Sequence, residues 1–137
     1  VCKQIAFIKS GIFRNFLIDS SGLEITYCIS FPNMLISAYS SLITQKPTQE
    51  NIEAISPSEI LVFSKHTLDQ YFSENPKWLQ FNKIIAEQEF VGLEERIFSL
   101  LKENAKERYI KLQQQHPEYI KNIPLQYLAS YLGISQR

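Results

Sequence analysis

The side chains that most often carry out chemistry are few in this sequence and lie far apart. Cysteine occurs only at Cys2 and Cys28, and histidine only at His66 and His116. These residues lack the short spacing of a zinc site, and a metal enzyme on a cupin-like roll would need clustered histidines and carboxylates along its strands. We therefore expect no metal, no cofactor and no enzyme activity, and we interpret both cysteines as buried, reduced thiols of a cytoplasmic protein.

The end of the sequence has a spacing that suits DNA reading. In LASYLGIS, Ala129 is followed four residues later by Gly133 and then by Ile134. A small residue lets two helices cross closely, a glycine takes a left-handed turn, and the next apolar residue fills the space between the helices. This spacing favours the scaffold of a helix-turn-helix. A single helix that ends at a glycine cap is the plainer interpretation.

The first helix of such a motif would bury three leucines, Leu125, Leu128 and Leu132. Ser135 would then cap the second helix, and Ser135, Gln136 and Arg137 would begin the element that contacts DNA. We expect the rest of the reading helix to lie beyond Arg137. The opening strand-like pattern similarly leads us to expect further strands before Val1.

The overall charge gives no support to a nucleic-acid surface. Fourteen basic and fourteen acidic residues leave a net charge of zero. No apolar run approaches the ~18 to 20 residues of a membrane-spanning helix, and the first residues do not form a signal peptide. We expect a protein without a membrane partner, and DNA binding must be argued from the motif alone.

The elements that position these residues follow the order strands first, helices afterwards. Two β-rich runs flank Ser10-Gly11, and a further turn at Asp19 to Gly22 precedes LEITYCISF, so two hairpins are predicted. Shorter strands fit residues 52–55 and 59–64. Many short antiparallel strands at this spacing predict a sandwich or a roll.

From Lys65 onward the apolar residues recur with a helical period. A short helix is predicted to end before Asn75-Pro76, and a long apolar stripe then runs from Phe81 to Leu101. A break is expected around Asn104, after which Glu107 and Lys111 stand four residues apart in the order that favours an ion pair. Pro117 should stop that helix, and the last helix should begin at Pro124.

Several runs in this order resemble the Crp/Fnr family of bacterial regulators, especially the branch common in Bacteroidetes. The helical half carries Glu95-Arg96, Ser99 to Leu101, Glu107 to Tyr109, Pro117, and Ile123 to Ser135 where the family has similar runs. In the first half, FIKSGIFRNF and IEAISPSEILVFSKHTLDQYF resemble a strand pair and the end of the family's β-roll.

The resemblance implies an α+β fold in three parts. Residues 1–75 would form an antiparallel β-roll like a cyclic-nucleotide-binding domain, with its first strands missing. Residues 76–104 would form a long dimerisation helix, and residues 105–137 an incomplete helix-turn-helix domain. The dimer helices would pair in parallel through residues such as Ile85, Leu93, Ile97 and Leu100. Packing of the same residues against the roll is the alternative.

Family members that bind cyclic nucleotides carry a Gly-Glu pair and an Arg followed by Ser or Thr. Here Ile36-Ser37 and Thr48-Gln49 stand in their places, so neither the phosphate partner nor the ribose acceptor is present. Lys46 is near, but it cannot fork onto a phosphate as arginine does. We expect no response to cyclic AMP. Any pocket for another small effector should be lined by Ser37, Tyr39, Thr48 and Gln49.

Three functions from different classes remain after these observations. The leading hypothesis is a homodimeric, DNA-binding transcription regulator whose β-roll controls the aim of two reading helices on double-stranded DNA. A sensor module that binds a ligand or a protein without binding DNA is the alternative. An enzyme on the same roll is disfavoured by the scarcity of metal ligands.

Overall fold

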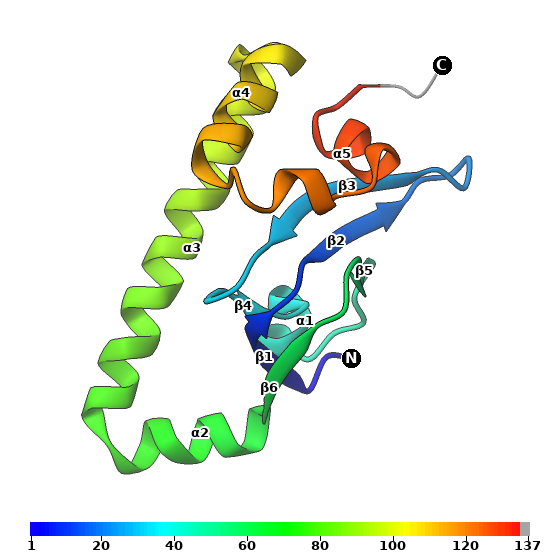
Figure 1. The fold of residues 1–137 in the computed structure, drawn as a ribbon. Coiled ribbons are helices and arrows are strands. Elements are labelled where there is room, and N and C mark those ends of the chain that lie inside the picture. Colours follow the sequence, from blue (N-terminus) through cyan, green and yellow to red (C-terminus); the bar gives the residue numbers. More distant parts are fainter. Residues whose placement is uncertain (135–137) are drawn as a thin grey trace.

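The computed structural model describes residues 1–134. Its N-terminal half is built from two three-stranded antiparallel sheets, which confirms the predicted roll (Figure 1). In the first sheet β1 lies between the two others, and its strands are β1 (Gln4–Ser10), β4 (Leu35–Ile36) and β6 (Glu59–Ser64). In the second sheet β2 is central, and its strands are β2 (Phe13–Ile18), β3 (Glu24–Ser30) and β5 (Glu50–Ala54).

One of the two predicted hairpins is present and the other is wrong. β2 and β3 pair across the turn at Asp19 to Gly22, where Gly22 has a φ of 85°. β1 and β2 do not pair with each other, because β1 joins β4 and β6 whereas β2 joins β3 and β5. Gly11, with a φ of 95°, turns the chain from one sheet to the other, and a Cβ there would collide with Ser58.

The helices follow the strands, as the sequence predicts. A short helix, α1 (Tyr39–Thr44), lies between β4 and β5. The others are α2 (Lys65–Glu74), α3 (Pro76–Lys102), α4 (Ala105–Gln115), the 3₁₀ turn η1 (Ile120–Asn122) and α5 (Leu125–Tyr131). Helix α3 runs along one side of the molecule, and α5 lies over the β2–β3 hairpin (Figure 1).

Local capping explains where the helices begin. Ser64 accepts a hydrogen bond from the Thr67 amide at the start of α2, and Asn75 caps α3 just before Pro76. Asn104 and Glu107 form a reciprocal capping box at the start of α4. The expected Glu107–Lys111 pair is therefore wrong: Glu107 is engaged at the cap, and Lys111 lies 3.6 Å from Glu103 instead.

Two apolar clusters hold the structure together. A small cluster lies within the roll, around the side chains of Ala6, Ile8, Phe13 and Ile36. The larger one joins the roll to the C-terminal helices, and its buried members are Ile12, Ile29, Phe31, Leu112, Ile120, Ile123, Leu128 and Leu132. The segment from α4 to α5 thus shares a core with the second sheet and does not fold as a separate globule within residues 1–134.

Candidate functional site

The end of α5 at Gly133 has the left-handed geometry that both interpretations of the sequence require, the helix-turn-helix corner and the plain glycine cap. Gly133 has a φ of 69°, its amide donates to the Ser130 carbonyl, and the Ile134 amide donates to the Ala129 carbonyl at 3.0 Å. These two bonds close the last turn of α5 in a Schellman motif, which satisfies carbonyls that would otherwise end the helix unpaired. Residues 124–134 are therefore neither a straight rod nor a strand.

The predicted inner face of α5 is partly wrong. Leu128 and Leu132 are buried, but Leu125 is 83% exposed because it lies in the first turn and faces away from the roll. Ile120 and Ile123, from the segment before α5, complete the apolar contact instead. Ala129 is half-buried, whereas Ile134 is 47% exposed. The predicted DNA-contacting residues, Ser135, Gln136 and Arg137, lie outside the described residues.

The hydroxyl of Ser130 attaches α5 to the exposed edge of strand β3. It accepts a hydrogen bond from the Thr26 amide at 2.8 Å and donates one to the Glu24 carbonyl at 3.1 Å. β3 is an edge strand of its sheet, so these backbone groups have no neighbouring strand on that side. A side chain of the helix thus completes the hydrogen bonding of the sheet.

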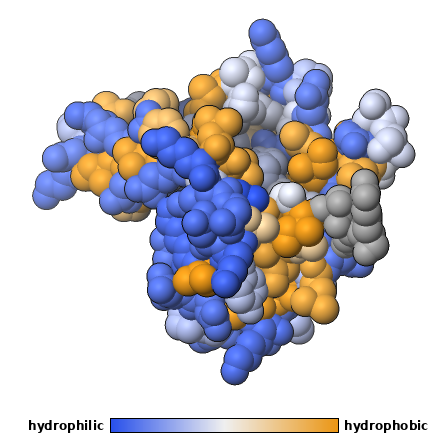
Figure 2. Space-filling model, turned by 90° about the horizontal axis from the view of Figure 1, so that it is seen from above, coloured by the Kyte–Doolittle hydropathy of each residue, from blue (hydrophilic) through white to orange (hydrophobic). Residues whose placement is uncertain are grey.

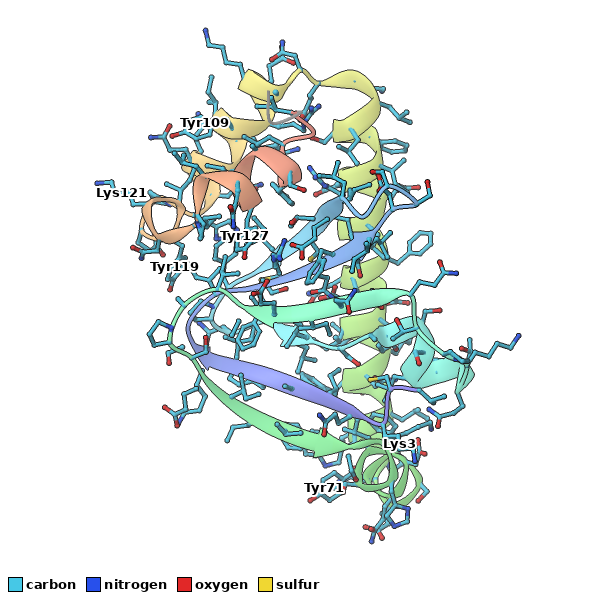
Figure 3. All side chains as sticks on the ribbon, turned by 90° about the vertical axis from the view of Figure 1, so that its right-hand side faces the viewer. Lys3, Tyr71, Tyr109, Tyr119, Lys121 and Tyr127 are labelled. Atoms are coloured by element: carbon cyan, nitrogen blue, oxygen red, sulfur yellow. The ribbon has the colours of Figure 1, made fainter. Side chains whose placement is uncertain are left out.

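A buried arginine forms the centre of the same contact. Arg14 on β2 is 2% exposed, and its guanidinium lies between the rings of Phe16 and Tyr127, 4.0 Å and 3.6 Å from their centroids. Tyr127 extends from α5 toward the strands (Figure 3). Glu24 and Glu53 both bind the guanidinium. Burial lowers the Arg14 pKa, but the hydrogen bonds and charges of the two carboxylates outweigh it, so the pKa is raised.

An aromatic stack forms the other end of the contact. The Phe31 ring stacks on His116 with centroids 3.9 Å apart and on Tyr119 at 5.3 Å. Burial lowers the pKa of His116, and the charge of Glu118 offsets this only in part. A neutral imidazole can lie against an apolar ring at less cost than a charged one. His116 is therefore a packing residue here.

Two arginines connect the C-terminal ends of α3 and α5. Arg108 on α4 donates to the Leu132 carbonyl from both Nε and Nη2, at 3.0 Å and 2.6 Å, and from Nη1 to the carbonyls of Ser99 and Glu103. Arg96 on α3 donates to the Tyr131 carbonyl and covers the Tyr131 ring. Cations are favourable at helix C-termini, where carbonyls carry partial negative charge. These bonds set the angle between α5 and the long helix.

The long helix exposes most of its apolar stripe. Of the predicted dimer residues, Leu93, Ile97 and Leu100 are 53%, 55% and 46% exposed, and Ile85 is half-buried. Phe81, Phe90 and Leu101 are also more than half exposed. Seen from the α4 end, apolar side chains reach the surface in several places (Figure 2). Packing against the roll leaves this stripe uncovered within residues 1–134.

The four predicted effector residues lie around α1. Ser37 donates to the Gln4 carbonyl, Tyr39 begins α1 and is 42% exposed, and Thr48 and Gln49 lie on the exposed loop before β5. None of them lines the groove of about 400 Å³ between the β2–β3 hairpin and α5, which is bordered by Leu23, Tyr127 and Gly133. The pocket assignment stays a prediction.

Sequence reasoning missed the residues that attach α5 to the roll. Arg14 carried one usable signal, since a charged residue inside the apolar run IFRNFLI suggests a buried and paired side chain. Ser130 and Arg96 carried none, because their partners are backbone groups of distant elements. Both cysteines are half-buried and unpaired, so the expectation of full burial is wrong, and burial raises the pKa of the Cys28 thiol.

Within residues 1–134, no three residues of the metal-ligating types Cys, His, Asp and Glu cluster closely enough to hold an ion. No helix formed by these residues combines the length and the hydropathy needed to cross a bilayer.

Comparison with known proteins relates the chain to regulators by its fold. No protein-family profile and no curated protein sequence matches it. Among solved structures, FixK2 from Bradyrhizobium japonicum superposes with a TM-score of 0.82 at 14% identity, over 97% of this chain and 69% of FixK2. A crp/fnr-family transcriptional regulator from Eubacterium rectale gives 0.74 at 18%, over 98% and 64%. The catabolite activator protein of Thermus thermophilus gives 0.58 at 20%, over 97% and 64%.

At these identities the likeness establishes the fold alone. The chain has the α+β fold that Crp/Fnr regulators use for a β-roll followed by helices. It spans about two thirds of the length of these neighbours. Nothing in the comparisons distinguishes a Bacteroidetes branch.

Proposed function

We propose that this chain is the sensor and dimerisation part of a DNA-binding transcription regulator of the Crp/Fnr type, with the beginning of its helix-turn-helix. In this proposal residues 1–75 form the effector roll, 76–104 the dimerisation helix and 105–137 the start of the reader. The protein acts in the cytoplasm as a homodimer on double-stranded DNA. Ser135, Gln136 and Arg137 begin the helix that enters the major groove.

The corner at Gly133 is the observation that carries this proposal. A lone glycine cap would end any helix, but here the capped helix is held on three sides. Leu128 and Leu132 pack against the roll, Ser130 binds β3, and Arg108 donates two hydrogen bonds to the Leu132 carbonyl. Because α5 is fixed to the roll in this way, the segment after Gly133 leaves it at a defined angle. A DNA-reading helix requires such a defined angle.

The exposed stripe of α3 supports the dimer. Leu93, Ile97 and Leu100 stand on one long helix and leave large apolar areas in solvent. Large exposed apolar patches in monomers mark interaction surfaces. A second copy related by two-fold symmetry would bury these residues against their equivalents and would place two readers on the same face of the DNA.

The proposed effector is not cyclic AMP. The positions that would hold the cyclic phosphate carry Thr48 and Gln49, both exposed and neither cationic. Lys46, two residues before Thr48, is exposed on the same loop, and its carbonyl accepts a hydrogen bond from Ser41. A buried phosphate without a forked cation would be costly to desolvate. Ser37, Tyr39, Thr48 and Gln49 stay the candidate lining for a different small molecule.

DNA selection tests the central part of the proposal. Full-length protein should enrich, from random duplexes, a two-fold symmetric site whose half-sites lie about one DNA turn apart, ~10 base pairs. Gly133→Ala should weaken this enrichment, because it disturbs the corner. Gly22→Ala imposes a similar left-handed strain at the hairpin and should leave it unchanged. A folded dimer that enriches no sequence would point to the alternative, a sensor module that binds only a ligand or a protein.

Calorimetry tests the effector part separately. Titration of cyclic AMP into the purified chain should give no binding heat. Micromolar binding would refute our interpretation that the loop around Thr48 lacks the groups to hold a cyclic phosphate. The DNA-binding proposal would be unaffected.

A further inference from the structure

Strand β6 is exposed on the face that points to the core of the roll. Its residues Val62 and Ile60 are the cross-strand partners of Ala6 and Ile8, which are buried in the small cluster of the roll. Cross-strand partners lie on the same face of a sheet, so Val62 and Ile60 also point to the core side. They are nevertheless 50% and 38% exposed. The core of the roll therefore lacks a cover at β6 within residues 1–134.

Strand β5 shows the same exposure in the second sheet. Ala54 pairs with Phe13, another member of the small cluster, and Ile52 pairs with the buried Asn15. Ala54 is exposed, and Ile52 is 40% exposed. Short connections join β1 to β2, β3 to β4 and β5 to β6, so β5 and β6 are the outermost strands at the same margin of the roll. This whole margin is open among the described residues.

The outer edge of β6 has no strand beside it. Within the described chain β6 pairs only with β1, and its middle residues, Ile60, Leu61 and Val62, include neither a charge nor a proline. Leu61, on the face away from the core, is 48% exposed. Proteins protect edge strands with charges, prolines or a covering segment. The edge of β3 has such a cover in Ser130 of α5, whereas β6 has no equivalent among residues 1–134.

The residues that lead into β1 lie close to this open edge. The Lys65 amide donates to the Lys3 carbonyl at 2.7 Å, which places Lys3 beside the first turn of α2, at the end of β6. Figure 3 shows Lys3 at this end of the molecule. A strand added to β6 would lie two strand spacings from β1, ~10 Å, which about three extended residues can span. A tethered segment also has an effective concentration in the millimolar range, which favours it over a separate molecule.

We propose that the open edge of β6, formed by Ile60, Leu61 and Val62, is the docking surface for an apolar β-strand from the part of the protein that precedes Val1. The backbone of this strand pairs with the outer side of β6, and its alternate side chains cover the open core. The proposal concerns the roll alone. It does not depend on DNA binding or on an effector, and it can be tested without either.

Photocrosslinking in the full-length protein identifies what covers β6. A photoreactive p-benzoylphenylalanine takes the place of Leu61, and mass spectrometry identifies the peptide to which it attaches. A mixture of ¹⁵N-labelled and unlabelled protein distinguishes attachment within one chain from attachment between two chains. We expect attachment within one chain, to a residue that precedes Val1. Attachment between chains would assign the edge to a second copy, and attachment elsewhere or none would leave the edge uncovered; each of these results would overturn the proposal.

Cysteine labelling gives an independent measurement with a smaller probe. With Cys2→Ser and Cys28→Ser as the background, Val62→Cys reports on the edge, and Ser20→Cys in the exposed turn of the β2–β3 hairpin is the control. In the full-length protein the thiol at position 62 should react with a maleimide roughly a hundredfold more slowly than the control, because the docked strand must first detach. Equal rates at the two positions in the folded full-length protein would overturn the proposal.

Removal of the residues before Val1 then tests which segment gives the protection. In the 137-residue chain the thiol at position 62 should react within about tenfold of the rate at Ser20→Cys, because Val62 is half exposed there. Circular dichroism verifies that this chain is folded. Protection that persists in the folded 137-residue chain would contradict the proposal, and the photocrosslink decides alone if the shortened chain does not fold.

Discussion

Helices α5 and α3 meet their surroundings in opposite ways. The seven-residue α5 is held by a shared apolar core, by Ser130 on the edge of β3 and by Arg108 at its C-terminal end. The 27-residue α3 buries only Ser99 and leaves residues such as Phe90 and Leu101 largely exposed. The short helix has many specific partners within the chain, whereas the long helix leaves most of its apolar side chains uncovered among residues 1–134, as the proposed dimer requires.

The largest expected effect is on the proposed dimer. Ile97→Lys places a charge within the C-terminal part of the α3 stripe, and two-fold symmetry repeats it in both copies. We expect a cost of about 4 kcal/mol, or roughly a thousandfold weaker dimerisation. Sedimentation equilibrium measures it. Glu94→Gln makes the same change in net charge at an exposed position of the helix and should leave the dimer intact; equal effects of both changes would remove α3 from the interface.

The next effect tests the contact of α5 with the roll. Leu128→Ala opens a cavity in the shared core and should lower the free energy of unfolding by about 3 kcal/mol. Leu125→Ala removes the same atoms from a side chain that is 83% exposed, and it should change the free energy of unfolding by less than about 0.5 kcal/mol. Urea unfolding at one fixed protein concentration measures both. Similar losses in the two variants would mean that α5 packs in a different orientation.

Two glycines in helical surroundings should respond with opposite signs. Gly133→Ala forces a side chain into the left-handed region and should cost about 1–2 kcal/mol. A Cβ there would only touch Arg108, at 3.4 Å, so the cost is conformational. Gly92→Ala, within α3 and free of neighbours, should raise stability by up to ~1 kcal/mol. Thermal and urea unfolding compare the two, and a stabilising Gly133→Ala would contradict the corner.

The smallest effect concerns the attachment at the sheet edge. Ser130→Ala leaves the Thr26 amide and the Glu24 carbonyl without their partner and should cost about 1 kcal/mol. Hydrogen exchange of the Thr26 amide should also accelerate. Ser73→Ala, which removes an exposed hydroxyl of α2, should change neither quantity. Unchanged exchange at Thr26 in the Ser130 variant would show that the contact does not persist in solution.

The predictable part of the candidate site is the part that depends on neighbours in the sequence. The position of Gly133 after an apolar helical run was enough to predict a left-handed turn at the end of α5, since the two bonds that close this turn span only three and five residues. The position of α5 was not predictable. It depends on Ser130 binding β3 more than a hundred residues earlier and on the stacking of Arg14 against Tyr127. No local pattern contains such a pairing.

The sequence by itself determined the order of strands and helices, the helix ends at Asn75, Asn104 and Gly133, and the hairpin at Gly22, because each depends on caps, prolines and glycines acting over a few residues. The tertiary structure alone decided that β1 and β2 enter different sheets, that Glu107 caps α4 instead of pairing with Lys111, and that Leu125 faces solvent. In each of these cases two locally reasonable arrangements compete, and contacts between distant residues select one.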